Sequence, residues 1–224
     1  MFYINIGAAP DNAKAQVEIF EKRGMKFDVV QSIDISEFNY SGYVQQMKDA
    51  DIEYVQMIGS DSTAVRLAQT MQQQGFEPVV FMNDPSVYKP DFVSAGGSAV
   101  EGTVVFTSVV PFEETASNDE MGLYTAWLQQ VKPGAEPTFF GAYAWSATRL
   151  VVETAIALGG TLDRASLTAA VAKVDDWTAN GLHAPQRVGT KRVGECNRFI
   201  ELRNGTWVPV GGTKYRCSGT TLLR

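Results

Sequence analysis

The sequence predicts an α/β fold built around a parallel sheet. The first half of the chain repeats one unit, which consists of an apolar run, a short turn and an amphipathic helix. The composition, 45% hydrophobic and 20% charged residues, is that of a globular protein. Strands that alternate with helices pair in parallel, and the helices then cover both faces of the sheet.

The elements of this repeat are placed by their apolar periodicity. The runs that predict strands are Phe2–Ile6, Phe27–Ile33, Tyr54–Ile58, Pro78–Met82 and Gly102–Thr107. The stretches that predict helices are Asn12–Arg23, Tyr40–Lys48 and Thr63–Gln74. In such sheets small ligands bind where the strands end. The loops expected at those ends are Gly7–Pro10, Gly59–Ser62 and Asn83–Pro85.

The pattern changes after Glu114, where three helices are expected without a strand between them. They are Asp119–Val131, Tyr143–Leu158 and Ser166–Val174. Asp163 is positioned to cap the third helix. Since the first sheet is already covered by its own helices, these later helices are expected to bury their apolar faces against a part of the protein other than that sheet.

The last part of the chain predicts a hairpin. The runs Arg198–Arg203 and Thr206–Val210 flank an Asn-Gly dipeptide, a strong signal for a two-residue turn. The two cysteines of the chain, Cys196 and Cys217, lie on either side of this hairpin. A disulfide between them would contribute about 3 kcal/mol in the chain-entropy model and would imply an oxidising compartment. Two free buried thiols are the alternative.

Charge and hydropathy argue against two classes of protein. The net charge is −6 and the pI is near 4.9, without a cluster of Lys and Arg, so a nucleic-acid partner is not expected. The longest apolar helix, Trp145–Leu158, is interrupted by Arg149 and Glu153, so it falls short of the ~20 apolar residues of a membrane span. Met1 leads directly into a strand, so we expect no signal peptide in this sequence.

Motifs for catalysis and cofactor binding are absent from the sequence. The loop Gly7–Pro10 has one glycine, and Pro10 lacks the N–H that a phosphate would bind. There is no nucleophile elbow, dinucleotide fingerprint or P-loop. The two cysteines and the one histidine, His183, lack the spacing of a metal site, and His183 is expected on the surface. We predict no enzyme activity, no cofactor and no metal; a flavodoxin-like enzyme is the rival interpretation.

Several segments together resemble one protein family. Residues 39–55 read N-Y-S-G-Y-V-Q-Q-M-K and then D-I-E-Y-V, and residues 83–105 contain N-D, D-F and A-V-E-G-T-V-V in that order. The A-Y-A-W-S-A run at 142–147 and Gly181-Leu182 fit the later part of the pattern. With this order of elements, the chain resembles the type I periplasmic solute-binding proteins, in the Leu/Ile/Val-binding branch of ABC importer receptors.

The resemblance implies a Rossmann-like lobe together with the helical part of a second lobe. Residues 1–112 would form the ligand-binding lobe two, residues 113–190 a helical remnant of lobe one, and residues 191–224 strands that return to lobe two. Members of the family carry most of lobe one ahead of the segment that matches Phe2–Ile6. The chain is therefore expected to lack most of that lobe.

The resemblance also implies where a solute binds. The acidic residue that holds a ligand ammonium in this family falls on Asp84, beside Asn83. A charge-assisted bond of this kind contributes about 1.5–3 kcal/mol. The other role of Asp84 is turn formation, and both roles can hold at once. A second carboxylate on the same edge, Asp61, would favour a cationic ligand end.

Two further loops of the family site fall on polar residues of this chain. Ser60 and Asp61 occupy the second position of the site. Capping of the following helix by Asp61 or Ser62 is the alternative, and we expect one of them to cap and the other to contact ligand. In the third loop, Asn12 is a candidate ligand contact or, like Asp11, a helix cap.

These expectations define a function. The chain would be the substrate-binding component of an ABC importer, binding an amino acid or a similar small solute, and exported to the periplasm or cell exterior with or without a lipid anchor. Its partners would be the solute, an ABC permease in the intact protein and a second copy through exposed helices. Trp127, Tyr143 and Trp145 are expected in the core or on that self-association surface. A ligand-sensing domain of a signalling receptor or regulator is the alternative function.

Overall fold

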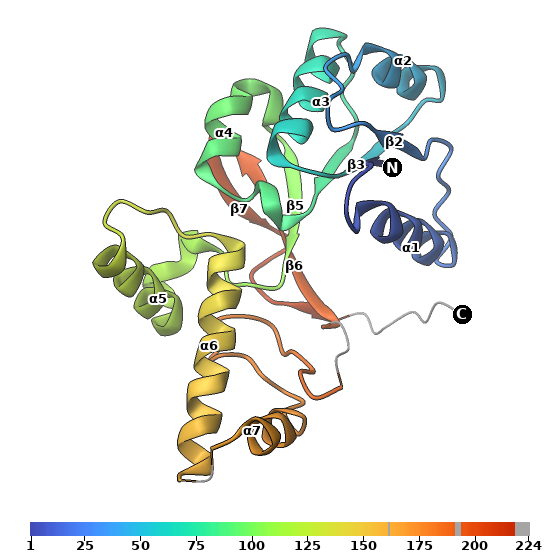
Figure 1. The fold of residues 1–224 in the computed structure, drawn as a ribbon. Helices are drawn as coiled ribbons and strands as arrows, with labels where there is room; N and C mark the ends of the chain where they lie inside the picture. Colours follow the sequence, from blue (N-terminus) through green and yellow to red (C-terminus); the bar gives the residue numbers. More distant parts are fainter. Residues whose placement is uncertain (161, 191–193, 218–224) are drawn as a thin grey trace. The chain divides into compact units, whose positions relative to one another are not determined.

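The computed structural model describes residues 1–160, 162–190 and 194–217, which form two compact units (Figure 1). Unit 1 contains Met1–Phe106 and Phe199–Val210. Unit 2 contains Thr107–Arg198 and residues 211–217. Each unit is described by itself.

Unit 1 is built on a sheet with the strand order β2-β1-β3-β4-β5-β6-β7. The pairs β1–β2, β1–β3, β3–β4 and β4–β5 are parallel, whereas β6 and β7 form an antiparallel hairpin. The predicted α/β fold with a parallel sheet is therefore confirmed. The strands are β1 Phe2–Ile4, β2 Gln31–Ile33, β3 Tyr54–Ile58, β4 Val80–Asn83, β5 Thr103–Thr107, β6 Cys196–Arg203 and β7 Thr206–Val210.

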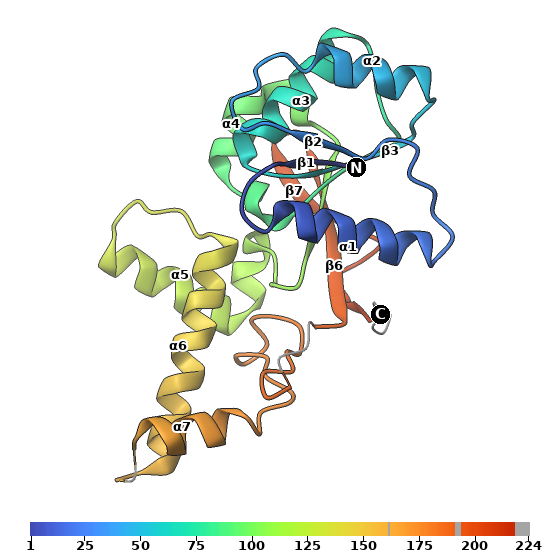
Figure 2. The same ribbon diagram turned by 45° about the vertical axis from the view of Figure 1, so that its right-hand side comes forward.

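Helices lie on both faces of this sheet, as the alternating side chains of β1 require. Phe2 meets the ring of Tyr43 in α2 edge-on at 5.9 Å, while Tyr3 packs with Ala13 of α1. Figure 2 shows α1 on one side of β1 and β2 and α2 and α3 on the other. The helices of unit 1 are α1 Ala9–Glu21, α2 Ser41–Asp49, α3 Asp61–Gln73 and α4 Pro90–Gly96, with 3₁₀ turns η1 Pro85–Val87 and η2 Gly97–Val100. The methionines Met47, Met57 and Met71 are buried in the core of this unit.

Two predicted boundaries in unit 1 are wrong for identifiable reasons. The strand predicted at Phe27–Ile33 is reduced to its last three residues, because Phe27 stacks on Phe20 of α1 and joins the cluster around Ala13. Helix α1 begins at Ala9, before the predicted Asn12, because proline is well tolerated in the first turn and Pro10 lies there.

Unit 2 is mainly helical. Its core contains Val109, Met121, Ala142 and Leu182, with Tyr143 and Trp145 partly buried around it. Trp127 is 49% exposed, which excludes the core and leaves the self-association surface of its two predicted places. The elements are η3 Phe112–Ser117, α5 Asp119–Val131, α6 Phe139–Leu158, α7 Arg164–Val171 and β8 Arg216–Cys217. Among the described residues no helix has both the length and the apolar character needed to cross a bilayer.

The helix cap, the hairpin and the disulfide predicted for the later part of the chain are all present. Asp163 forms a capping box with Ser166 at the start of α7. The β6–β7 hairpin turns at Asn204-Gly205, and Cys196 is bonded to Cys217, its antiparallel partner in β8. The predicted disulfide is therefore present, and the alternative of two free thiols is wrong.

Candidate functional site

The sheet of unit 1 defines one edge where a ligand is expected. Strand β1 lies between β2 and β3. The connection from β1 leads to β2 on one side, and the chain then crosses to β3, β4 and β5 on the other side. In open α/β sheets ligands bind outside the carboxyl ends of the strands at such a switch point. The loops after β3 and β4 meet this edge, because Met57 near the end of β3 pairs with Asn83, the last residue of β4. We call residues 59–62 and 83–89 the lip.

Ser60 and Asp61 form the first part of the lip, at the start of α3. Ser60 is the N-cap of α3, and its hydroxyl accepts from the Thr63 N–H at 3.3 Å and lies 2.9 Å from the Ser62 hydroxyl. The predicted capping by Asp61 or Ser62 is therefore wrong, since Ser60 has the extended backbone that the N-cap position requires. Asp61 is the first residue of the helix and is paired with Lys89, 3.0 Å away.

Asn83 and Asp84 form the second part of the lip. Asp84 caps η1 by accepting from the Ser86 N–H at 2.8 Å through Oδ1. Among the described residues this is the hydrogen bond that its carboxylate makes, so Oδ2 remains available to a ligand. Asn83 is 1% exposed, and its Nδ2 has no hydrogen-bond partner in the described part of the chain. An unpartnered buried donor is costly, which makes Asn83 a candidate for a ligand or water contact.

Hydrogen bonds and tight packing connect the two loops of the lip. The Ser86 hydroxyl donates to the Gly59 carbonyl oxygen at 3.4 Å, and Lys89 reaches Asp61 from the chain that follows η1. A Cβ added at Gly59 would lie 2.6 Å from Thr63 Oγ1 and 2.7 Å from Met57 Cε. Glycine is therefore the residue that lets β3 approach the start of α3 this closely.

The lip contains four of the five predicted ligand residues, namely Ser60, Asp61, Asn83 and Asp84. Asn12 lies near the start of α1, where its Oδ1 accepts from Gln16 Nε2 at 2.9 Å, and it is not the cap of that helix. Asp11 likewise lies inside the first turn of α1, so the capping role predicted for either residue is wrong. Lys89 was missed, because its partner Asp61 belongs to a different element and no local pattern indicates the pair.

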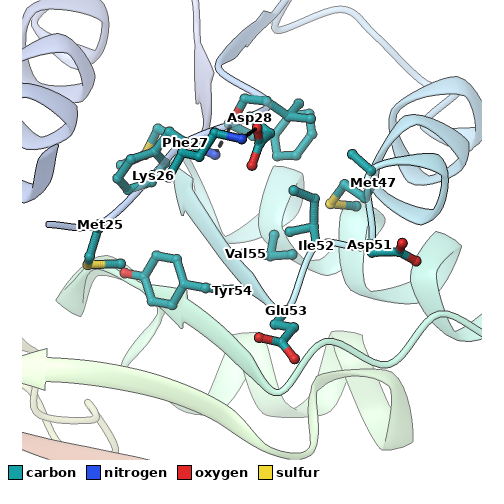
Figure 3. A pocket seen from close by; sticks show the side chains of 14 residues that line it. Met25, Lys26, Phe27, Asp28, Met47, Asp51, Ile52, Glu53, Tyr54 and Val55 are labelled. Atoms are coloured by element: carbon teal, nitrogen blue, oxygen red, sulfur yellow. Dashed lines mark hydrogen bonds and ion pairs between the residues drawn. The ribbon is translucent and has the colours of Figure 1, made fainter.

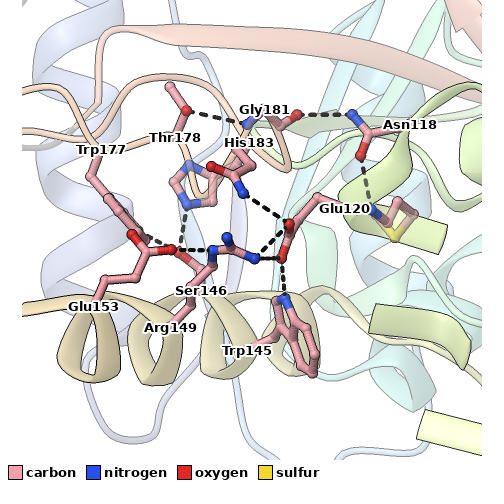
Figure 4. Close-up of polar contacts among 12 residues, drawn as sticks. Asn118, Glu120, Trp145, Ser146, Arg149, Glu153, Trp177, Thr178, Gly181 and His183 are labelled. Carbon is pink, nitrogen blue, oxygen red and sulfur yellow. Dashed lines mark hydrogen bonds and ion pairs between the residues drawn. The ribbon is translucent and has the colours of Figure 1, made fainter. Parts of the chain in front are cut away.

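A second polar cluster lies in unit 2 (Figure 4). Glu120 is 5% exposed and accepts from Arg149 Nη1 at 2.7 Å, Trp145 Nε1 at 2.7 Å and Asn180 Nδ2 at 3.3 Å. Figure 4 shows the side chains of Arg149 and Trp145 converging on the Glu120 carboxylate. Because each Glu120 oxygen has partners, we interpret the cluster as part of the fold of unit 2.

His183 lies beside this cluster and corrects a prediction. It is 2% exposed, not on the surface, because it pairs with Val109 and stacks on the ring of Tyr143 at 5.3 Å. Its Nδ1–H donates to the Ala184 carbonyl at 2.8 Å, so Nε2 accepts from the Ser146 hydroxyl at 2.7 Å. Burial lowers the pKa of His183 from its usual 6.5, which keeps the ring neutral.

A pocket of about 220 Å³ lies at the opposite, amino edge of the sheet of unit 1 (Figure 3). Met1, Phe27 and Tyr54 line it, and its Asp28 is already paired with Lys26. The Met1 ammonium donates to the Val29 carbonyl at 2.8 Å, and burial lowers the pKa of this ammonium to about 6. The predicted ligand residues do not line this pocket, and in the described part of the chain no cluster of His, Cys, Asp and Glu is arranged to hold a metal ion.

A scan against protein families matches residues 7–206 to the family described as periplasmic binding protein. The chain belongs to this family. It is a class of solute-binding proteins, and the predicted resemblance to type I periplasmic solute-binding proteins is confirmed. A search of curated proteins found no match.

Solved structures with the same fold include receptors for different solutes. A putative branched-chain amino acid ABC transporter from Rhodospirillum rubrum is 19% identical with a TM-score of 0.78, and the match covers 93% of this chain and 59% of that one. A branched-chain amino acid ABC transporter from Thermus thermophilus with bound valine is 16% identical, with a TM-score of 0.77 and coverage of 97% and 60%. A fatty acid ABC transporter substrate-binding protein from Thermomonospora curvata is 18% identical, with a TM-score of 0.77 and coverage of 97% and 56%. This periplasmic binding protein thus spans about three-fifths of the length of these relatives.

Proposed function

We propose that this chain is the substrate-binding component of an ABC importer and that unit 1 is its ligand-binding lobe two. The observation that carries the proposal is Asp84, which stands at the carboxyl end of a parallel strand with one carboxylate oxygen free of hydrogen bonds to the described residues. A carboxylate placed in this way can hold a ligand ammonium. The family match over residues 7–206 supports a binding role and gives no reason to expect catalysis.

The solute is proposed to be an amino acid or a related small amine. Ser60 and Asn83 would add hydrogen bonds beside Asp84, and the exposed side chain of Ile6 follows β1 at the same edge. The relative from Thermus thermophilus was solved with bound valine, which makes valine the first solute to test. Since the lip of unit 1 offers contacts from one side, we expect a dissociation constant of about 1 mM, equivalent to about −4 kcal/mol.

Export and the partners of the intact protein are further parts of the proposal. The Cys196–Cys217 disulfide is typical of proteins that fold in an oxidising compartment, so we propose a periplasmic or extracellular location. Closure around the solute would be the state that an ABC permease recognises.

Self-association is proposed for the apolar surface of α5 and α6. Large exposed apolar areas mark interaction sites, and a second copy of the chain carries the same surface. Sedimentation over a range of concentrations should show a dimer, and a monomer at high concentration would contradict this part of the proposal. The exposed residues are Leu123, Trp127, Val131, Phe140, Val151, Val152 and Ile156.

Ligand-observed NMR tests the binding role directly. Saturation transfer from the protein to valine at millimolar concentration should be detected, and it should be lost in Asp84→Asn because the neutral amide cannot neutralise an ammonium. Asp91→Asn, which changes an exposed acidic residue in the first turn of α4, serves as the matched control and should keep the signal. Equal signals from Asp84→Asn and the wild type would contradict the assignment of Asp84.

A further inference from the structure

The tip of the β6–β7 hairpin carries a chemically labile dipeptide, Asn204-Gly205. Both residues have positive φ values, 51° and 73°, and Arg203 pairs with Thr206, so the two residues form a type I′ turn. In an Asn-Gly sequence the backbone nitrogen of the glycine can attack the side-chain carbonyl carbon of the asparagine, because glycine has no Cβ to obstruct the approach. Both residues are exposed, so water reaches the turn.

The carboxylate of Glu101 holds the backbone of this turn from a distant part of the sequence. Its Oε1 accepts from the Gly205 N–H at 2.8 Å, and its Oε2 accepts from the Asn204 N–H at 2.7 Å. Glu101 lies just before β5 and is 103 residues away from Asn204 in the sequence. Hydrogen bonds to a carboxylate are about twice as strong as those between neutral groups. The nitrogen that would attack is therefore held by a tertiary contact.

Deamidation at this turn would proceed in two steps. The Gly205 nitrogen bonds to Asn204 Cγ, and its proton goes to the side-chain nitrogen, which leaves as ammonia and closes a succinimide ring. Water then adds to either carbonyl carbon of the ring, and ring opening gives aspartate or isoaspartate. Ring closure requires rotation about the Cα–C bond of Asn204, and this rotation moves the Gly205 N–H away from Glu101.

We propose that Asn204 is a deamidation site and that Glu101 slows the reaction by holding the turn. While the Gly205 N–H is bound to Glu101, its nitrogen does not reach Cγ, so the turn must open before the ring can close. The loss of one charge-assisted hydrogen bond changes such an opening equilibrium about tenfold. The product carries a new negative charge beside Glu101, and repulsion between the two carboxylates would weaken the contact further.

A second Asn-Gly dipeptide, Asn180-Gly181, serves as a reference within the same molecule. It lies in unit 2 and also has positive φ values, 54° and 83°. Its contacts differ, because Asn180 Nδ2 donates to Glu120 at 3.3 Å and the Gly181 N–H donates to the Thr178 hydroxyl at 3.2 Å. Since neither contact involves Glu101, a variant of Glu101 should leave the reaction at Asn180 unchanged.

Peptide mapping by mass spectrometry, after incubation of the chain at mildly alkaline pH, measures both sites. In the folded wild-type chain Asn204 should deamidate at least about tenfold more slowly than in the chain unfolded in guanidinium chloride. Glu101→Ala should remove most of that protection at Asn204 and leave Asn180 unchanged. Glu101→Gln keeps one acceptor oxygen and should give an intermediate rate. Glu77→Ala, which removes another exposed carboxylate at the amino edge of the same sheet, is the matched control and should react as the wild type does.

The unfolded samples separate the tertiary contact from the intrinsic reactivity of the dipeptide. Unfolded wild type and unfolded Glu101→Ala should react equally at Asn204, because Glu101 is close to the turn only in the folded chain. The inference is overturned if folded Glu101→Ala reacts at the wild-type rate, or if it reacts more slowly, since Glu101 would then promote the reaction as a base. It is also overturned if Asn204 and Asn180 accelerate together, because that result indicates a general loss of structure.

Discussion

Units 1 and 2 each present a carboxylate near a group of polar side chains, and the two groups differ in how far their hydrogen bonds are satisfied. Glu120 in unit 2 is buried and receives hydrogen bonds from Arg149, Trp145 and Asn180. Asp84 in unit 1 is half-buried, accepts from the Ser86 N–H and retains an acceptor oxygen. A buried charge with all its partners supports a fold, whereas a spare acceptor at a strand end is suited to a ligand.

The largest expected effect comes from removing Glu120. Glu120→Ala would leave Trp145 Nε1 without its acceptor and Arg149 with only the exposed Glu153, so we expect a loss of about 3 kcal/mol in the free energy of unfolding. Urea unfolding measures the loss, and hydrogen exchange should place it in residues 107–198. Glu153→Ala, which removes a 45% exposed carboxylate, is the control. Equal losses in the two variants would refute a structural role for Glu120.

Removing the disulfide of unit 2 should have a similar effect. The bond joins residues 21 apart, and replacing Cys196 and Cys217 by serine should lower the free energy of unfolding by about 3 kcal/mol, because the unfolded chain gains freedom. Chemical denaturation of the double variant, and of the reduced wild type, measures this change. Unchanged midpoints in both samples would show that the bond does not constrain the unfolded chain.

A smaller effect localised to unit 1 is expected from Gly59→Ala. The new methyl group would meet Thr63 Oγ1 and Met57 Cε at distances below 3 Å, so overpacking should cost about 1–3 kcal/mol. Gly42→Ala in α2 is the matched control, because a Cβ there has no atom within 4 Å and alanine favours helix. The control should be neutral or slightly stabilising. If Gly59→Ala is as stable as Gly42→Ala, the close approach of β3 and α3 is wrong.

The smallest effect is a pH dependence that arises at His183 in unit 2 and adds to the one from the Met1 ammonium of unit 1, whose pKa burial lowers to about 6. Burial lowers the pKa of His183 in the folded state, so the folded chain binds its proton less readily than the unfolded chain does. Stability should therefore fall as the pH drops below about 6.5, the unfolded value, until the lower folded pKa is reached. Urea midpoints from about pH 7.5 to about pH 5 measure this change. His183→Gln should flatten the profile, and an unaltered slope in that variant would contradict the assignment.

Periodicity in the sequence predicted most of the fold because each strand and helix has its own apolar pattern. β3, β7 and α5 have the predicted bounds. The predictions were wrong where a side chain packs outside the regular pattern. Phe27 has strand character but stacks on Phe20, so the β2 ladder begins only at Gln31, and Pro10 lies in the first turn of a helix where a loop was predicted.

The sequence could predict which loops form the candidate site, because they follow predicted strands. It could not predict which side chains of those loops contact one another. Parallel topology predicted that the loops after β3 and β4 lie at one edge, and the resemblance to the family placed the candidate ligand residues Ser60, Asp61, Asn83 and Asp84 in those loops. The pairing of Asp61 with Lys89 depends on how two loops meet, and no local pattern encodes it. The burial of His183 likewise depends on partners distant in the sequence, such as Ser146.

An amide-resolved NMR titration of the chain with valine would show whether the lip binds the solute. We expect the shifts to concentrate at residues 59–62 and 83–89 and to disappear in Asp84→Asn. Shifts concentrated instead at the pocket around Phe27 and Tyr54, or shifts at the lip that persist in Asp84→Asn, would contradict this expectation.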